Sequence, residues 1–377
     1  MRLKTSFSFV CLCIVAGPVL VSSDAEQALP RPSEDINTDE LIDKFDSYNR
    51  YTVDRKELNT TVLVYVTPWN KHGYEIAEIF ARKFTHVSPV WFEVTGMKKS
   101  YTITGVPNID KDWILRVRAA NPAIKIVPRI IFGEWRDQDF IDTLGDTTRT
   151  NKCISNIVRA VEQYGFDGAV IEIWSQFSGA DLRSLIDFVI RLGDAFRASK
   201  LTSVLVIPPP IYKSDYPGRI GRKSLEPLFD HIDYFSLMTY DYSSPVSPGP
   251  SSPLNWVKKC VELLVPSDSE DFERRRSQLL VGLNFYGMDY IPRNQQGEPI
   301  LGSQLIDILK KTKAKLSWNK EAAEHFFKYT DAHGQEHLVF YPTLMSIARR
   351  ISAVNGFGSG VSIWEIGQGQ DSFYTLF

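Results

Sequence analysis

Short runs of β-branched and aromatic residues alternate along this chain with longer stretches of helical periodicity. Because parallel strands need a crossover connection, usually a helix, this alternation predicts repeated βα units and a parallel sheet. Eight such units favour an α/β fold of the (β/α)8 TIM-barrel type over the alternative, an open doubly wound sheet. The expected strands are Val62–Thr67, His86–Phe92, Ile124–Phe132, Gly168–Trp174, Ser203–Pro208, Tyr234–Tyr240, Leu279–Tyr286 and Gly360–Glu365, and the helices between them include Gly73–Phe84, Lys111–Asn121, Leu182–Ser199 and Thr343–Asn355.

The interval between the last two expected strands is too long for one helix. Within it, the residues Phe326–Tyr341 read as two strands around the turn sequence Asp331-Ala332-His333-Gly334, which is typical of a β-hairpin. We therefore expect a small α+β insertion over about 290–342. The barrel would span residues 61–377, after an N-terminal arm over 24–60.

Composition excludes several classes of protein. The 377 residues carry a formal net charge of −2, so a nucleic-acid partner held by electrostatic attraction is not expected. A hydrophobic fraction of 43% is sufficient for a large core and argues against disorder.

The N-terminus has the pattern of a secretory signal peptide. Arg2 and Lys4 precede the apolar run Phe7–Val21, and the small residues Ser22 and Ser23 follow, so we expect cleavage after residue 23. A membrane anchor is the alternative, but the run is short and contains Pro18. No later segment is apolar enough to span a bilayer. The sequence therefore predicts a secreted protein, with the lysosome as a further location, that is not an integral membrane protein.

Secretion bears on the cysteines and on one asparagine. Cys153 and Cys260 remain after cleavage, and both fall in amphipathic helical patterns about a hundred residues apart. We expect two buried, unpaired thiols, although an oxidising compartment permits a bridge. Asn59-Thr60-Thr61 is an N-glycosylation sequon just before the first strand, and Asn59 is expected to carry a glycan.

The fourth expected strand carries the most distinctive motif, Phe166–Trp174 (FDGAVIEIW). Alternate residues of a strand face opposite sides, which places Val170, Glu172 and Trp174 toward the barrel interior. Three further segments accompany it at later strands: Met238–Asp241 (MTYD), Gly282–Gly287 (GLNFYG) and Gly360–Glu365 (GVSIWE).

Together these four segments resemble glycoside hydrolase family 18, the chitinase-like proteins, in the right order over about Val62–Phe377. The hairpin Phe326–Tyr341 is similar to one in the bacterial spore-cortex branch of that family. The resemblance also extends to animal chitinase-like proteins. It implies the TIM barrel and a carbohydrate ligand, such as an N-acetylated or microbial oligosaccharide.

The resemblance also implies the chemistry of the fourth strand, which reads DGxDxDxE in the family. There the last Glu protonates the leaving group, while the Asp two residues earlier orients the acetamide that acts as nucleophile. Asp167 begins the motif and is expected to be structural. Val170, Glu172 and Trp174 stand at the second Asp, the third Asp and the Glu. Because an indole has no proton to donate near neutral pH, this comparison predicts that the chain is not an enzyme.

Glu172 leaves an alternative open, because it could act as a displaced acid from two residues deeper, roughly 6–7 Å along the strand. Its charge also requires a partner. Arg129 on the neighbouring strand is one candidate, and a protonated Glu172 bonded to Tyr240 or to water is another. Trp174 would either stack on a sugar at the barrel mouth or simply fill the core.

Aromatic residues gather where the strands are expected to end, the face at which TIM barrels place their sites. Sugar rings stack on aromatic planes while their hydroxyls take polar partners, although a single barrel-end aromatic is usually core. The residues expected to bind carbohydrate are Trp69, Trp91, Trp135, Trp174, Tyr240, Asp241, Tyr286, Trp364 and Glu365, with Trp364 and Trp69 foremost. The six histidines are scattered, so neither a metal nor another cofactor is expected.

These observations favour a secreted or lysosomal lectin that binds oligosaccharides without hydrolysing them. By resemblance alone, such a protein would act in innate immunity. Two alternatives remain: an active glycosidase that uses Glu172, and a protein-docking module sorted by a scavenger receptor. The resemblance implies that this receptor would be stabilin-1.

Overall fold

The structure of this chain is a computed structural model that describes residues 30–177 and 181–377. The expected signal peptide and the first residues of the arm lie outside the described residues. The main sheet is built from β1 (Val62–Val66), β2 (His86–Pro89), β3 (Phe92–Val94), β4 (Ile103–Thr104), β5 (Lys125–Ile126), β6 (Arg129–Phe132), β7 (Gly168–Glu172), β8 (Thr202–Ile207), β9 (Tyr234–Leu237), β10 (Leu279–Asn284) and β16 (Gly360–Trp364).

The strands of this sheet follow the order β4-β3-β6-β7-β8-β9-β10-β16-β1-β2-β5, and every pairing except β3 with β4 is parallel. Its two edges meet, because only Val127 and Pro128 separate β5 from β6. The Val127 amide donates to Val87 on one side, and the Val170 amide donates to Pro128 on the other. The sheet therefore curls into a barrel, and the fold is α/β.

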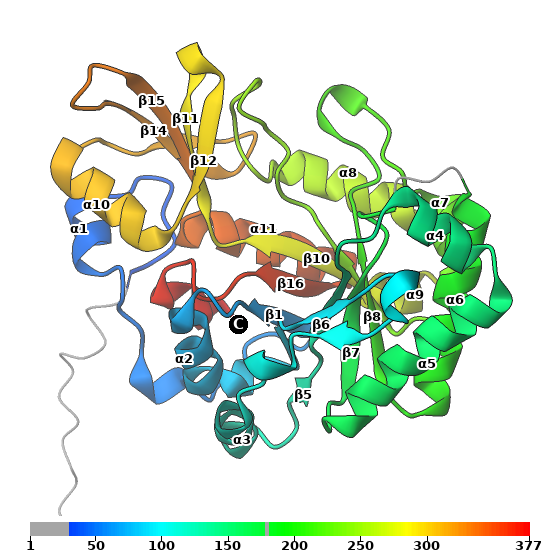
Figure 1. Cartoon of the computed structure of the whole chain (residues 1–377). Helices are drawn as coiled ribbons and strands as arrows, with labels where there is room; N and C mark the ends of the chain where they lie inside the picture. The colour runs from blue at the N-terminus through cyan, green and yellow to red at the C-terminus, as the bar shows by residue number, and fades with distance from the viewer. Residues whose placement is uncertain (1–29, 178–180) are drawn as a thin grey trace, which may run out of the picture.

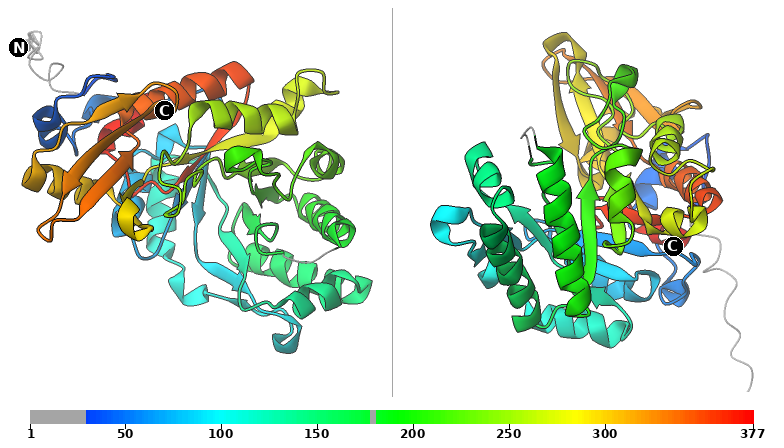
Figure 2. Two further views of the ribbon diagram at one scale, coloured as in Figure 1. Left: turned by 90° about the horizontal axis from the view of Figure 1, so that it is seen from above. Right: turned by 90° about the vertical axis from the view of Figure 1, so that its right-hand side faces the viewer.

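Helices cover the outside of this barrel (Figures 1 and 2). The helices of the described residues are α1 (Thr38–Asp43), α2 (Lys71–Ile79), α3 (Lys111–Ala120), α4 (Asp137–Leu144), α5 (Thr147–Gln163), α6 (Leu182–Ala198), α7 (Arg222–Leu225), α8 (Leu254–Leu264), α9 (Phe272–Gln278), α10 (Gly302–Thr312) and α11 (Leu344–Phe357). Of these, α1 and α10 pack against each other to one side of the barrel (Figure 1). Helix α5 illustrates why the helices form. The Asp146 side chain caps its first turn, and Ile154, Ile157 and Val161 recur at helical spacing on its buried face.

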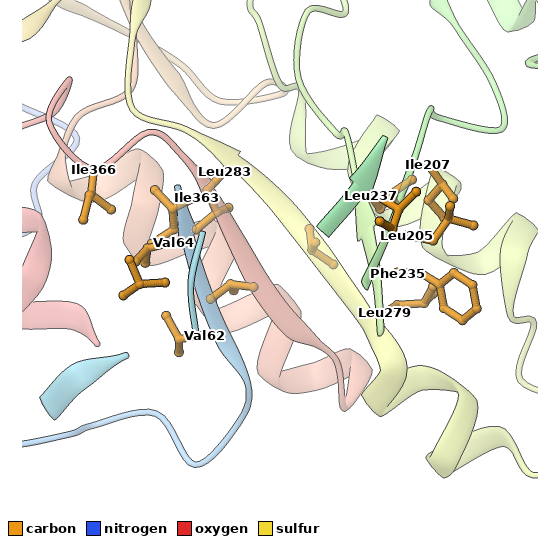
Figure 3. Packing of buried hydrophobic residues seen from close by; sticks show 14 of the residues in the cluster. Val62, Val64, Leu205, Ile207, Phe235, Leu237, Leu279, Leu283, Ile363 and Ile366 are labelled. Atoms are coloured by element: carbon orange, nitrogen blue, oxygen red, sulfur yellow. The ribbon is translucent and has the colours of Figure 1, made fainter. Parts of the chain in front are cut away.

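Two hydrophobic clusters follow from the alternation along the strands. On β1, Val62 and Val64 point outward into the large cluster between the sheet and the helices (Figure 3). Leu63 and Tyr65 point inward and join a small cluster inside the barrel, with members such as Val170. This small inner cluster lies directly beneath the carboxyl ends of the strands and forms the floor of any site there.

The part of the chain that connects β10 to β16 forms a second sheet. This sheet lies outside the barrel, at the top of Figure 1. Its five antiparallel strands are β11 (Gly287–Ile291), β12 (Gln296–Ile300), β13 (Ser317–Asn319), β14 (Glu324–Thr330) and β15 (Glu336–Tyr341). Glu324 of β14 pairs with Arg350 of α11 at 3.2 Å, and each side chain is only 1% exposed. This buried ion pair anchors the second sheet to the barrel, and loss of either partner would leave an uncompensated charge.

The cysteines agree with the sequence-based expectation. Cys153 and Cys260 are both buried and free, and burial raises the pKa of each thiol to about 12. Among residues 30–177 and 181–377, no helix combines the length and the apolar character needed to cross a membrane.

Candidate active site at the barrel mouth

The carboxyl ends of the parallel strands bring five side chains together above the inner cluster. Tyr65 comes from β1, Arg129 from β6, Glu172 from the end of β7, Tyr240 from just beyond β9, and Trp364 from the end of β16. We call this group the mouth. Strand polarity contributes to it, because parallel strands place their carboxyl ends at one edge of the barrel, whereas Arg129 begins β6 and reaches the group with its long side chain.

Glu172 is the central charged group of the mouth. Arg129 directs both Nε and Nη2 at its Oε2 oxygen, each at 2.7 Å. The hydroxyl of Ser175 donates to the other carboxylate oxygen at 3.0 Å. The Arg129 and Glu172 side chains are 15% and 17% exposed, so the pair is screened from solvent but remains accessible. Of the two partners that the sequence suggested for Glu172, Arg129 is therefore the one observed.

Trp364 forms an aromatic wall beside this ion pair. The Arg129 guanidinium lies 5.6 Å from the centre of its ring, within the range of a cation–π interaction. Tyr65 packs against the same indole with ring centres 5.2 Å apart, and its hydroxyl donates to Ser236 at 2.9 Å. Trp364 is only partly buried, so its indole plane remains a surface on which a sugar ring can stack.

Asp241 and Tyr286 extend the mouth toward the second sheet. Tyr286 donates its hydroxyl hydrogen bond to Asp241, and its ring contacts that of Tyr240 edge-on. Asp241 retains solvent contact, but the surrounding protein raises the pKa of its carboxyl. Burial raises the pKa of the Tyr240 phenol well above 10, so this hydroxyl stays protonated and can donate a hydrogen bond to a ligand. The mouth thus holds two carboxyl groups in different electrostatic surroundings.

Trp174 does not lie at the mouth, contrary to the expectation from strand alternation. It is 1% exposed and packs with Ile171 and Ile173 in the outer cluster between the sheet and the helices. Strand β7 ends at Glu172, and a turn follows in which the Gln176 amide bonds back to Ile173. Once the backbone leaves the extended conformation, side chains no longer alternate, and the indole rotates outward.

Two more of the expected carbohydrate-binding residues belong to the packing between the sheet and the helices, Trp91 fully buried and Trp135 partly buried. The indole of Trp91 donates to Tyr74 at 2.7 Å, and the indole of Trp135 donates to the carbonyl of Val94 at 2.8 Å. Both rings belong to the aromatic packing of the outer layer, as their contacts with Trp113 and Phe140 show. A sugar cannot reach the buried ring of Trp91 without displacing this packing.

Glu365 is fully buried on the opposite side of β16 from Trp364. Its carboxylate accepts hydrogen bonds from Asn70 at 2.5 Å and from the Gly367 amide at 2.9 Å. Glu365 lies one residue beyond the end of β16, so these contacts rather than strand alternation fix the direction of its side chain. Glu365 instead ties the loop after β1, which carries Trp69, to the end of β16. Trp69 itself is 70% exposed.

The remaining predicted positions have structural surroundings. Asp167 accepts from Arg118 at 2.9 Å and from the Ile126 amide at 2.8 Å, which fixes the start of β7 against its neighbour. Val170 lies in the inner cluster. Asn59 is exposed before β1, at the opposite end of the barrel from the mouth. Its glycosylation stays a prediction.

Tyr65 and Ser175 are mouth residues that the sequence-based list did not include. The alternation of β1, which places Leu63 and Tyr65 inward, could have revealed Tyr65. Ser175 had no such signal, because its position depends on the turn after β7. Among residues 30–177 and 181–377, no three His, Cys, Asp or Glu side chains cluster closely enough to hold a metal ion.

Comparisons with known proteins agree with this architecture. The profile of the glycosyl hydrolases family 18 matches residues 61–369. A cortical fragment-lytic enzyme of Bacillus subtilis is 23% identical over 249 residues, which cover 63% of this chain and 56% of that enzyme. The chain spans about half the length of the curated relatives it matches.

Two solved structures show the shared fold. A chitinase from Chromobacterium violaceum superposes with a TM-score of 0.71 at 20% identity, covering 84% of this chain and 97% of the chitinase. The spore cortex-lytic enzyme SleL of Bacillus megaterium superposes with a TM-score of 0.70 at 18% identity, covering 84% and 73% of the two chains. At these identities the likeness concerns the fold alone. None of these comparisons concerns the animal branch or a receptor, so the animal branch and the stabilin-1 partner stay predictions.

These relatives contradict the prediction that the chain is not an enzyme. They are named as lytic enzymes and chitinases rather than as inactive binding proteins. The geometry also removes the premise of that prediction, because Trp174 does not occupy the mouth and Glu172 does.

Proposed function

Because this chain belongs to the glycosyl hydrolases family 18, we propose that it is a glycosidase that cleaves chains of N-acetylated amino sugars at the barrel mouth, with Glu172 as its proton donor. The observation that carries this proposal is the position of Glu172 at the end of β7. Its carboxylate is held by Arg129 and Ser175 beside the ring of Trp364. Among the described residues, no other carboxyl group accepts hydrogen bonds from both Arg129 and Ser175.

The proposed reaction needs only one protein carboxyl group. The acetamide oxygen of the substrate attacks the anomeric carbon while the bond to the leaving oxygen breaks and Glu172 transfers its proton to that oxygen. Water then opens the cyclic intermediate and returns a proton to the Glu172 carboxylate, so that atoms and charge balance. Tyr240, with its protonated phenol, would hold the acetamide in place.

The roles of Arg129 and Trp364 follow from their contacts. Arg129 forms an ion pair with the Glu172 carboxylate, and this arrangement suits the second step, where the carboxylate accepts a proton. For the first step the carboxyl must be protonated, so the proposal requires Arg129 to turn away when a sugar fills the mouth. The Trp364 ring, already 5.6 Å from the guanidinium, offers the cation a neighbouring position.

Hydrolysis of a fluorogenic N-acetylglucosamine oligomer tests the proposal. Wild type should release the fluorophore, and Glu172→Gln should reduce the rate by about 10² to 10⁴-fold. Asp241→Asn is the informative companion, because Asp241 is the second carboxyl group at the mouth. If Asp241→Asn abolishes turnover while Glu172→Gln does not, the glycosidase remains but the donor is Asp241. No turnover by wild type on chitin or peptidoglycan chains would refute the proposed activity.

A further inference from the structure

One face of the second sheet is turned toward the loop that follows β9. Directly opposed residues of antiparallel strands share a face, and Leu338 opposes both Tyr290 and Lys328. The Tyr290 ring lies against Gly297, and Pro245 of the loop after β9 is next to the same glycine. Since Asp241 belongs to the same loop, this face continues outward from the mouth.

A cavity of about 840 Å³ opens on this sheet, between the turn after β11 and the hairpin of β14 and β15. Arg293, Lys328 and His333 bring basic groups to its lining, whereas Glu336 is the one acidic side chain that lines it. In the described part of the chain, neither Arg293 nor Lys328 makes an ion pair or a side-chain hydrogen bond. Two permanent positive charges therefore face this cavity without partners.

The wall behind these charges is rigid. His337 also lines the cavity, and its Nδ1 atom lies 2.8 Å from Asp289. Tyr329 donates to the same carboxylate at 2.6 Å, and its ring stacks on the imidazole at 4.4 Å. Nε2 of His337 is buried without a hydrogen-bond partner among the described residues, and its nearest carboxylate, on Asp331, is 3.7 Å away. In the part of the chain that the structure describes, both of these aspartates pair with His337 and neither forms an ion pair with Arg293 or Lys328.

A second hollow of about 560 Å³ adjoins the first and shares Lys328 and Thr330 with it. Lys311, at the end of α10, adds another basic side chain there, again without an ion pair in the described ranges. Basic groups thus follow one another along the outer part of the sheet. The apolar side chains of Ile291 and Leu338 line the first cavity together with its basic residues.

We propose that this cavity binds negatively charged substituents of the glycan, carboxylates or sulfate esters, whose sugar chain continues from the mouth. The inference rests on the proposed function for the chain that enters the mouth and adds the charge of the substrate. Arg and Lys are the side chains that bind such oxyanions, and apolar patches between them suit the C–H faces of sugar rings. The site would favour acidic chains over neutral ones.

Calorimetric titration of the full chain carrying Glu172→Gln, which prevents turnover, measures this preference. The probes are four sugars long: a neutral N-acetylglucosamine chain, a chain that alternates with carboxylate-bearing N-acetylmuramic acid, its amidated form, and a sulfated N-acetylglucosamine chain. At least one charged chain should bind about tenfold more tightly than the neutral chains, and the advantage should shrink as salt rises. The carboxylated and sulfated probes distinguish the two sources of negative charge.

Arg293→Glu/Lys328→Glu should abolish the advantage of the charged chain over the neutral chain. Lys152→Glu/Arg159→Glu is the matched control, because both residues are exposed on α5 without ion pairs in the described part of the chain and the charge change is identical. Equal affinity for charged and neutral chains, or an equal loss in both double variants, would overturn the inference. Hydrolysis of the neutral chain by wild type would then still support the glycosidase. Charged-chain binding by a protein that hydrolyses nothing would refute the glycosidase alone.

Discussion

Arg129 and Glu172 join two neighbouring strands of the barrel through one carboxylate oxygen, which accepts from two guanidinium nitrogens at 2.7 Å each. Arg129 begins β6 opposite Val170, so its long side chain reaches two residues further along β7 to meet Glu172. The interaction therefore fixes the register of β6 against β7 at the point where the mouth opens. Its strength and the role of Glu172 can be measured separately.

Arg129→Met should lower the free energy of unfolding by about 1.5–3 kcal/mol, because it leaves the screened Glu172 carboxylate with only Ser175. Glu172→Gln in the same background should restore part of the loss, since the uncompensated charge disappears. Urea denaturation of the two single variants and the double variant gives the coupling energy. Additive losses would mean that the ion pair contributes nothing to stability.

Trp364→Ala should weaken oligosaccharide binding more than tenfold, about 1.4 kcal/mol, because it removes the aromatic wall of the mouth. Trp69→Ala should have a smaller effect, since that ring is largely in solvent. Calorimetric titration with an N-acetylglucosamine oligomer measures both. Trp364→Phe preserves an aromatic face against Tyr65 and serves as the control for packing. Unchanged affinity in both alanine variants would place the sugar site elsewhere.

Trp174→Ala should destabilise the fold by about 3–5 kcal/mol, as expected for a large side chain deleted from a close-packed cluster. Trp174→Phe should be milder, and its turnover should remain within about threefold of wild type because the indole does not face the mouth. Thermal unfolding and hydrolysis rates of the two variants provide the test. A large loss of turnover in a well-folded Trp174→Phe variant would show that this ring contacts substrate after all.

The free energy of unfolding should fall as pH rises, in two pH ranges. Glu365 and His72, two groups near the end of β16, set these ranges. Burial raises the pKa of Glu365 to about 7, so the folded state holds this proton more tightly than the unfolded state, and stability from this group is lost between about pH 4.5 and 7. The hydrogen bond from His72 to Asp371 raises the pKa of His72 to about 9, and its contribution is lost as pH rises from about 6.5 through 9.

Glu365→Gln and His72→Gln separate these ranges. The first should flatten the slope below pH 7, because the buried group no longer ionises. The free energy of unfolding that wild type loses to this group between about pH 4.5 and 7, up to about 3 kcal/mol, should then be retained. The second should flatten mainly the slope above pH 7, with a smaller change below it, because His72 lowers the pKa of the neighbouring Glu365. Urea denaturation at closely spaced pH values supplies the curves, and an unaltered slope below pH 7 in Glu365→Gln would rule out this assignment.

Secretion and glycosylation stay predictions of the sequence. We expect the secreted chain to begin near Asp24 and to carry a glycan at Asn59, which is exposed before β1. Intact-mass spectrometry before and after enzymatic deglycosylation measures both features, with Asn59→Gln as the control. A secreted chain that retains Met1, or that shows no mass change on deglycosylation, would contradict the corresponding prediction.

The sequence alone was sufficient to predict the strands, because their period and composition reflect local geometry. Each of the eight expected barrel strands overlaps an observed strand, as in Val62–Val66 and Gly360–Trp364, although two of the eight are divided. The same alternation predicted Val170 and Glu172 inside the barrel and suggested Arg129 as the partner of Glu172. Inside a strand, the side of the sheet that a side chain faces follows from its position in the sequence, so no tertiary information is needed to predict it.

Only the tertiary structure decided what happens where the strands stop. Gln176 exchanges hydrogen bonds with the backbone of Phe132, which fixes the turn after β7 and directs Trp174 into the outer cluster. Glu365 is likewise held by Asn70, a residue almost three hundred positions earlier in the chain. Side chains beyond a strand end take their direction from such long-range contacts, and a one-dimensional pattern does not contain them. For this reason the sequence predicted the barrel, while the structure identified which of its aromatic and acidic residues form the mouth.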